Sequence, residues 1–194
     1  GGSFAGNIGM GGTLAVTGNT TVGGTLGVTG AVTLGTKLAT TNLATGAVVQ
    51  VKNVQNGAVA TTTTQMVFDD TIPQKTEGGE FMTLAITPTN SSNTLLIETE
   101  LNLDTSVTQY MVVALFQDAT ANAIAAGFLH MGGVEQSKRI HLKFKMAAGT
   151  TSATTFKVRA GIPASGTTTF NGVNTSRLMG GVLNSYMQIT EVAV

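Results

Sequence analysis

Two adjacent carboxylates, Asp69 and Asp70, are the first residues of this sequence whose types could do chemistry. A carboxylate pair that flanks a glycosidic bond needs two groups about 5 to 10 Å apart across a cleft. Neighbouring residues of a strand point to opposite faces, which is the wrong geometry for such a pair. The order Asp-Asp-Thr-Ile-Pro instead favours a turn capped by an aspartate. Glu77 and Glu80 could bind a cation with Asp70, although a solvated loop is the favoured interpretation.

Other candidates for catalysis are few. His130 and His141 are the two histidines, and His141 lies among cations without a local metal partner. No serine lies in a nucleophile-elbow motif, so a Ser–His–Asp arrangement stays open only for residues distant in sequence. Cysteine is absent, which excludes disulfides and thiolate metal sites. We therefore expect no catalytic residues, no cofactor and no metal site.

Several cations lie within the segment 139–146, where apolar and polar side chains alternate as they do in a strand. If the segment 156–160 is its neighbour in a sheet, further cations join the same surface. Such a surface could attract anionic sugars or phosphate groups. It could equally be a solvated face, or pair with Glu98 and Glu100 across an interface between chains. The cations concerned are Arg139, Lys143, Lys145, Lys157 and Arg159, and we take Arg139, Lys143 and Arg159 as candidate receptor contacts.

The segment 165–184 is predicted to be a long loop, because it is rich in Gly, Thr and Asn and has only scattered apolar residues. Loops on a rigid scaffold often carry binding function. This one combines a flat aromatic, amides and a guanidinium, which are groups that recognise sugars. We hypothesise that Phe170, Asn171, Asn174 and Arg177 form part of a receptor site. The alternative is that Phe170 and Leu178 anchor the loop in the core.

These residues must be positioned by β-strands, which begin after about residue 46, where charges and aromatics become frequent. The run 110–116 is almost continuously apolar, which is typical of a strand covered on both faces. About eight strands with almost no helix signal predict a β-sandwich with jelly-roll-like topology. The predicted strands are 48–54, 81–87, 95–103, 110–116, 128–131, 139–146, 156–160 and 186–194.

The segment 11–45 is repetitive, with a six-residue register that reads GGTLAV, TGNTTV, GGTLGV and TGAVTL. Its larger aliphatics fall two residues apart, as Leu14 and Val16 do, which is strand spacing. The Gly-Gly and Thr-Gly pairs between them are turn signals. Such strands bury a core only by stacking, and three chains wound about one axis would close a narrow one. A disordered linker is the alternative.

The composition favours burial of the surface against other copies of the chain. Of 194 residues, 42% are hydrophobic and 10% are charged, with a net charge of zero. Typical globular proteins are about 25% charged. The zero net charge argues against nucleic-acid binding, and no apolar run is long enough to predict a membrane-spanning helix or a secretory signal. We expect an obligate homo-oligomer without membrane insertion.

Two groups of passages resemble viral proteins. The run TLAVTGNTTVGGTLGVTGAVTL (13–34) is similar to repeats in tail fibres and tailspikes of tailed bacteriophages. The stretch FDDTIPQKTEGGEFMTLAITPTNSSNTLLIE (68–98), with SRLMGGVLNSYMQITEV (176–192), resembles a β-sandwich domain at the C-terminal tips of such fibres. The resemblance implies a homotrimeric fibre whose tip contacts a bacterial surface receptor, often a polysaccharide. It carries no fixed receptor-binding residues to this chain.

The resulting prediction is an all-β homotrimer with residues 1–46 as a trimerising shaft of short strands and 47–194 as a jelly-roll-like antiparallel head. As a virion component made in the host cytoplasm, it would bind host surface polysaccharide or lipopolysaccharide during adsorption. The alternative is a purely structural fibre or trimerisation module with recognition elsewhere. A depolymerising tailspike is the third reading, which the short chain and few carboxylates disfavour.

Overall fold

The computed structural model describes residues 16–25, 27–31 and 43–194. The chain divides into two units, residues 1–38 and 39–194. Most of the predicted shaft, including Leu14 and Leu34, lies outside the described residues. Within residues 16–25 and 27–31 of the single chain, no strand forms, and bends recur every six residues, at 17–18, 23–24 and 29–30. The backbone thus follows the six-residue register, while the shaft of stacked strands from several chains stays a prediction.

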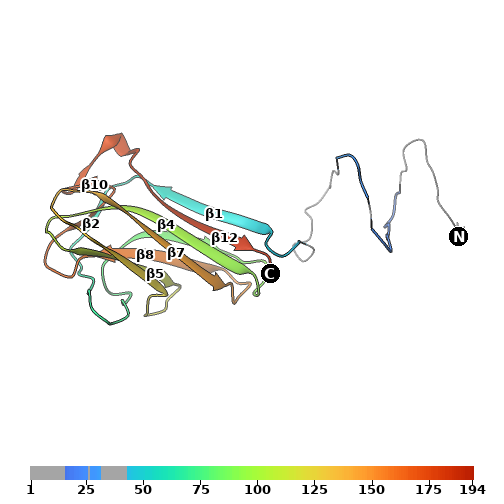
Figure 1. Cartoon of the computed structure of the whole chain (residues 1–194), viewed down its shortest axis with the longest axis horizontal. Helices are drawn as coiled ribbons and strands as arrows, with labels where there is room; N and C mark the ends of the chain where they lie inside the picture. The colour runs from blue at the N-terminus through green and yellow to red at the C-terminus, as the bar shows by residue number, and fades with distance from the viewer. Residues whose placement is uncertain (1–15, 26, 32–42) are drawn as a thin grey trace, which may run out of the picture. The chain divides into compact units, whose positions relative to one another are not determined.

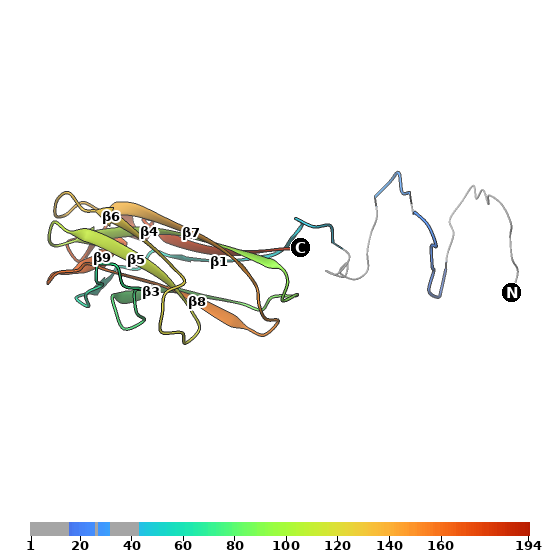
Figure 2. The same ribbon diagram turned by 60° about the horizontal axis from the view of Figure 1, so that its bottom comes forward.

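Eight long antiparallel strands build the second unit and confirm the predicted β-sandwich. One sheet has the order β1-β12-β4-β7 and the other the order β3-β8-β5-β6. This alternation of strands from distant parts of the chain is the connectivity of a jelly roll. Figures 1 and 2 show the two sheets as packed layers. The long strands are β1 (Val48–Asn56), β3 (Gly79–Ile86), β4 (Thr94–Thr105), β5 (Tyr110–Gln117), β6 (Ala125–His130), β7 (Lys138–Ala147), β8 (Thr154–Gly161) and β12 (Ser185–Val192).

The segment predicted as one long loop, 165–184, contains short elements that the sequence pattern does not reveal. The strand β9 (Thr168–Phe170) pairs with the end of β4 and with β2 (Ala60–Thr62), and so extends the first sheet. The strands β10 (Gly172–Val173) and β11 (Ser176–Arg177) form a small hairpin, and a 3₁₀ turn, η2 (Met179–Gly181), follows. Two- and three-residue strands are too short to show alternation, which is why the sequence hid them.

The main core lies between the sheets and follows the alternation of their strands. Leu101 and Leu103 of β4 are fully buried, whereas Glu98 and Glu100 earlier in the same strand and the cations of β7 point outward. Burial of these alternating apolar faces supplies the main driving force of folding, at roughly 25 cal/mol per Å² of apolar surface. No helix in the described parts of the chain is long and apolar enough to cross a membrane.

A second, smaller core lies on the outer face of the β3-β8-β5-β6 sheet. There the irregular segment 63–78 crosses the sheet and buries Met66 against Val112 and Phe116 of β5. This cover explains why β5 is buried on both faces, as its apolar run predicted. The segment returns to β3 through Gly78, whose φ of +59° and distance of 2.6 Å from an added Cβ to the carbonyl oxygen of Ala160 leave room only for glycine.

The chain enters and leaves the sandwich at one end. The backbone N–H of Gly46 donates to the carbonyl oxygen of Ala193 at 2.8 Å, and the N–H of Ala193 donates to the carbonyl oxygen of Ala47 at 2.9 Å. Gln50, near the start of β1, donates to the carbonyl oxygen of Thr87, which follows β3. We call this the entry end, and the opposite end, where β4 and β1 finish and β5 begins, the far end.

Candidate functional site

The hypothesised sugar site on the segment 165–184 is not assembled as predicted. Phe170 is fully buried and stacks on Phe81 with ring centroids 5.0 Å apart, so it fills the core as the alternative proposed. Asn171 is also fully buried. Asn174 and Arg177 are exposed at the far end, on the β10–β11 hairpin. The structure therefore corrects the hypothesis, because two of the four side chains have no surface to offer.

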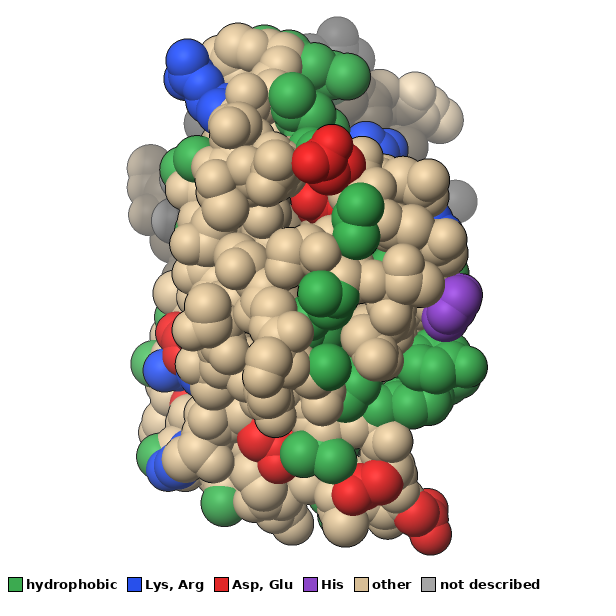
Figure 3. Space-filling model, turned by 90° about the vertical axis from the view of Figure 1, so that its left-hand side faces the viewer, with side chains coloured by type: hydrophobic (Ala, Val, Ile, Leu, Met, Phe, Trp, Pro, Cys, Tyr) green, Lys and Arg blue, Asp and Glu red, His purple; other side chains and the backbone are tan. Residues whose placement is uncertain are grey.

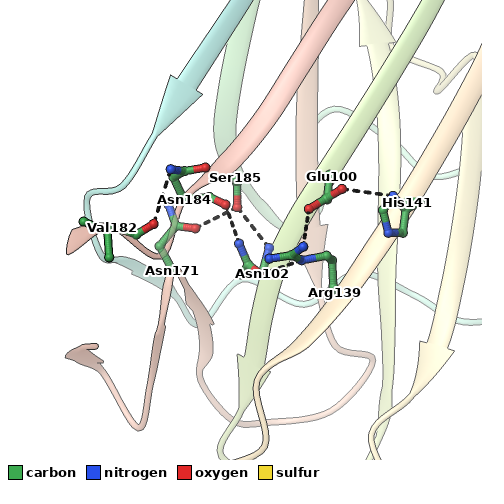
Figure 4. A network of polar contacts seen from close by, with 8 residues as sticks. All are labelled: Glu100, Asn102, Arg139, His141, Asn171, Val182, Asn184 and Ser185. Atoms are coloured by element: carbon green, nitrogen blue, oxygen red, sulfur yellow. Dashed lines mark hydrogen bonds and ion pairs between the residues drawn. The ribbon is translucent and has the colours of Figure 1, made fainter. Parts of the chain in front are cut away.

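Asn171 has a structural role, which Figure 4 shows. Its side-chain oxygen accepts a hydrogen bond from Ser185 Oγ at 2.7 Å, and its Nδ2 donates to the carbonyl oxygen of Asn56. Ser185 Oγ in turn accepts from the backbone N–H of Asn102 at 2.9 Å. The residue sits at φ +54°, a conformation that asparagine adopts more readily than most residues. It thus joins the ends of β1, β4 and β12 beneath the surface.

The predicted cationic surface is divided between the two sheets. β7 pairs with β4, and β8 lies between β3 and β5, so the five cations do not share one face. Arg139 pairs with Glu100 at 2.8 Å, and Lys143 pairs with Glu98 at 2.6 Å. The carboxylates named as partners across an interface therefore lie beside these cations in the same chain. This pairing offsets the charge of two of the three predicted β7 cations, while Lys145 is exposed and takes part in no ion pair among the described residues.

The cations of β8 are also paired. Arg159 donates to the carbonyl oxygens of Glu77 and Gly78 at 2.8 and 2.7 Å and approaches Glu80 at 3.3 Å. Lys157 reaches the same Glu80 carboxylate at 3.4 Å. Glu80 is therefore engaged with cations, and the described residues contain no group of three His, Cys, Asp or Glu side chains placed to hold a metal ion.

An exposed aromatic patch that the sequence analysis did not predict lies on the outer face of the β3-β8-β5-β6 sheet. We define it as Phe68, Tyr110, Phe128 and His130. Phe68 stacks on Tyr110 with centroids 4.2 Å apart and meets Phe128 edge-on at 4.8 Å, and Tyr110 meets His130 at 5.0 Å. Phe128 is 60% exposed. A hydrophobic patch beside a histidine is visible on the face drawn in Figure 3.

Strand pairing and the cover segment assemble this patch. Tyr110 is opposite His130 in the β5–β6 register, and Phe128 is opposite Val112, so alternate residues of both strands face outward together. Phe68 arrives from the segment 63–78, held by the buried Met66 two residues earlier. Since β5 begins and β6 finishes here, the patch lies toward the far end.

A shallow groove continues from the patch between the cover segment and β6. The hollow next to the aromatic rings has a volume of about 210 Å³, and the adjoining one about 330 Å³. Asp69, Thr71 and Pro73 line both hollows, and Asp70 lines the second. The groove thus has an aromatic end and a carboxylate-bearing wall, a combination of apolar lining and few polar groups that is typical of ligand sites.

Asp69 confirms the turn-capping interpretation. Its Oδ1 accepts hydrogen bonds from the backbone N–H of Thr71 at 2.8 Å and from Thr71 Oγ1 at 2.6 Å. These bonds, from the side chain first and then the backbone, hold the pKa of Asp69 below its ordinary value. The carboxylate is therefore charged at neutral pH, which suits a hydrogen-bond acceptor in the groove and not a general acid.

The sequence contained only a partial signal for this site. Tyr110 opens the apolar run of its strand and Phe128 lies in a predicted strand, but their meeting depends on which strands pair. Phe68 begins the stretch 68–98 that resembles a fibre-tip domain, but its position over β5 depends on the path of an irregular segment. Neither strand order nor that path can be read from alternation alone.

No protein-family model and no curated protein matches this chain. Solved structures that are similar in part include the infectious bursal disease virus VP2 subviral particle, with 9% identity and a TM-score of 0.33 over 75% of this chain and 38% of that one. A protein from Bacillus endospore appendages, which form disulfide-linked pili, has 16% identity and a TM-score of 0.28 over 79% of this chain and 100% of that one.

Dimeric latent PorU from Porphyromonas gingivalis has 8% identity and a TM-score of 0.35 over 77% of this chain and 14% of that one. The chain thus spans 38% of the VP2 chain and a smaller share of PorU. At these TM-scores the similarities carry no argument about this chain, and its function has to be argued from its own surface.

Proposed function

We propose that this chain is the non-enzymatic tip of a homotrimeric bacteriophage tail fibre and binds a glycan on the bacterial surface. The observation that carries the proposal is the exposed aromatic patch beside the groove. Monomeric proteins rarely expose large contiguous apolar patches without a binding role. Sugar rings present flat arrays of C–H groups that pack on aromatic faces, while their hydroxyls need hydrogen-bond partners of the kind that Asp69 and Asp70 offer.

The position of the patch supports this proposal. It lies toward the far end of the sandwich, away from residue 46, through which the repeat segment is joined to the head. A fibre whose repeats form the shaft would present this end to a cell. Because four of the five cations considered in the sequence analysis are paired with carboxylates of the same chain, and Lys145 alone among them is not, we propose a neutral saccharide epitope, within a surface polysaccharide or lipopolysaccharide, as the ligand.

The test uses the full chain and measures glycan-array binding and adsorption to whole bacteria. Phe128→Ala removes the most exposed ring of the patch, and its expected effect is at least about a tenfold loss of affinity, the equivalent of about 1.4 kcal/mol. Val182→Ala is the matched control, since Val182 is 78% exposed outside the patch. The control should bind as the wild type does.

Light scattering on the same samples distinguishes the proposal from its competitors. A wild-type protein that binds no glycan and no cell would leave the structural module as the function. If Phe128→Ala converted the oligomer to monomers, the patch would be an interface between chains and not a receptor site. Release of reducing sugar from host polysaccharide would replace the binding function by a depolymerising one.

A further inference from the structure

Asp104 carries a buried carboxylate oxygen without a partner. Its side chain lies near the end of β4 and is 1% exposed. Oδ2 accepts a hydrogen bond from the backbone N–H of Asn174 at 2.9 Å, whereas Oδ1 is buried and has no hydrogen-bond partner. An unpaired buried charge is costly unless an ion or a donor compensates it. Among the described residues, no ion pair involves Asp104.

A second carboxylate is joined to Asp104 through Asn174. The Nδ2 of Asn174 donates to Glu135 Oε1 at 3.0 Å, so one residue connects both acidic side chains, by its backbone and by its amide. Asn174, in the turn of the β10–β11 hairpin, and Glu135, in the loop 131–137, are both exposed. The buried Asp104 is therefore joined, through one residue, to two exposed side chains that carry oxygen atoms.

The two loops hold unusual backbone conformations at this point. Glu135, Asn174 and Thr175 have φ values of +55°, +47° and +66°. For a β-branched residue such as Thr175, a positive φ is an outlier that surrounding contacts must maintain. Its N–H donates to Thr169 Oγ1 at 3.2 Å, on the strand residue that faces Asp104. The β10–β11 hairpin is thus fixed against β4 and β9 in a backbone geometry that unstrained chains avoid.

We propose that Asp104 and Glu135, with the side chain of Asn174, bind a calcium ion at the far end of the head. Carboxylate and amide oxygens are the ligands that calcium takes, in a flexible shell of six to eight oxygens. Backbone carbonyls and water complete that shell. Magnesium requires near-ideal octahedral geometry, so we expect this site to bind magnesium more weakly than calcium. Asp104 lies in the other sheet, whereas Glu135 lies in the loop after β6, five residues beyond His130 of the aromatic patch. The calcium proposal does not rest on the glycan proposal, and separate variants test the two.

The experiment begins with the full chain treated with EDTA and dialysed. Thermal unfolding and isothermal titration calorimetry are then recorded with CaCl₂ and with MgCl₂. Extracellular calcium modules bind with a Kd of about 0.1 to 1 mM, which at 10 mM calcium corresponds to a rise in Tm of about 3 to 10 °C. Magnesium should give a clearly smaller shift. No calcium heat and no shift in Tm would overturn the proposal.

The variant Asp104→Asn keeps an acceptor for the N–H of Asn174 but removes the charge. Its expected signature is loss of the calcium shift together with a calcium-free Tm at or above that of the wild type, since an uncompensated buried charge is gone. Glu135→Gln, at an exposed position, should reduce the calcium shift without affecting folding. A full calcium shift in both variants would overturn the assignment to this site.

Asp118→Asn is the matched control. Asp118 is also a carboxylate at a positive φ, of +52°, but both of its oxygens are partnered, by Thr155 N–H and by Thr154 Oγ1. Its substitution should leave the calcium response of the full chain unchanged. A loss of the response in this control would show that calcium acts elsewhere, and would equally reject the Asp104 site.

Discussion

At the scale of single residues, the feature with the clearest chemical consequence is Glu191, which is fully buried near the entry end. Its carboxylate accepts hydrogen bonds from Gln50 at 2.6 Å, Asn93 at 2.7 Å and both the N–H and Oγ1 of Thr89 at 2.8 Å. Burial raises the pKa of Glu191, but the hydrogen bonds from Gln50, Asn93 and Thr89 outweigh it, so the pKa lies below the ordinary 4.5. Glu191 thereby holds the loop after β3 against β12.

The predicted consequence is sensitivity to acid. Because the folded-state pKa is the lower one, the stabilisation is fully present above pH 4.5 and is lost as the pH falls through the folded-state pKa. Glu191→Gln replaces one carboxylate oxygen, which accepts these hydrogen bonds, by an amide NH₂ group, which donates. The substitution should lower the free energy of unfolding by about 1 to 3 kcal/mol at pH 7. Urea unfolding at pH 7 and pH 3 should show a smaller difference in unfolding free energy between the variant and the wild type at pH 3 than at pH 7. Glu98→Gln, at an exposed ion pair, should change stability by less than about 1 kcal/mol.

At the scale of elements, alternation was enough to predict the eight long strands but not what covers them. Because side chains on a strand alternate, the pattern of 139–146 predicted a strand with one apolar and one polar face. The apolar run 110–116 predicted a strand that is covered on both faces. The short strand β9 and the path of the segment 63–78 depend on contacts between distant residues. Phe170 is the clearest case. The composition of its segment predicted a sugar contact, but the pairing of β9 with β4 places its side chain in the core.

The cover segment 63–78 leads to a prediction about the element as a whole. Met66 is the fully buried side chain that fastens this segment to β5. Met66→Ala should cost about 2 to 5 kcal/mol in unfolding free energy, since it leaves a cavity under an irregular segment. Hydrogen exchange should rise along 63–78, and ligand binding at Phe68 should weaken with it. Met179→Ala, at a position 71% exposed, is the control and should be nearly neutral; a loss equal to that of Met66→Ala would contradict the role of Met66.

At the scale of the whole molecule, the repeat segment still presents apolar side chains to solvent in the single chain. Val16, Val22 and Val28 lie six residues apart and are 52%, 49% and 49% exposed. Their period equals that of the bends, so each repeat offers one valine in an equivalent place. We expect other copies of the chain to bury this stripe, because non-polar surface repeated along a segment is typical of assemblies that gain their core by association.

Replacing all three valines by serine tests this expectation. The wild type should sediment as a trimer, and the triple variant should shift toward the monomer while the circular dichroism of the head stays unchanged. The expected change follows from losing roughly 1.5 to 3 kcal/mol per valine that is buried on assembly. A wild-type monomer, or a triple variant that remains a trimer, would contradict assembly through the repeat segment.

The pairing of β1 with β12 has a mechanical consequence. β1 receives the chain from residue 46 and meets β12 in antiparallel register from Val48 opposite Val192 to Asn56 opposite Ser185. When a ligand holds the far end and tension enters through residue 46 along the strand, the hydrogen bonds of this ladder are loaded in shear, all at the same time. Peeling, in which bonds break one after another, would need a pull across the strand. If the chain is the fibre tip that we propose, this ladder would let the head resist drag without any bond stronger than those of an ordinary sheet.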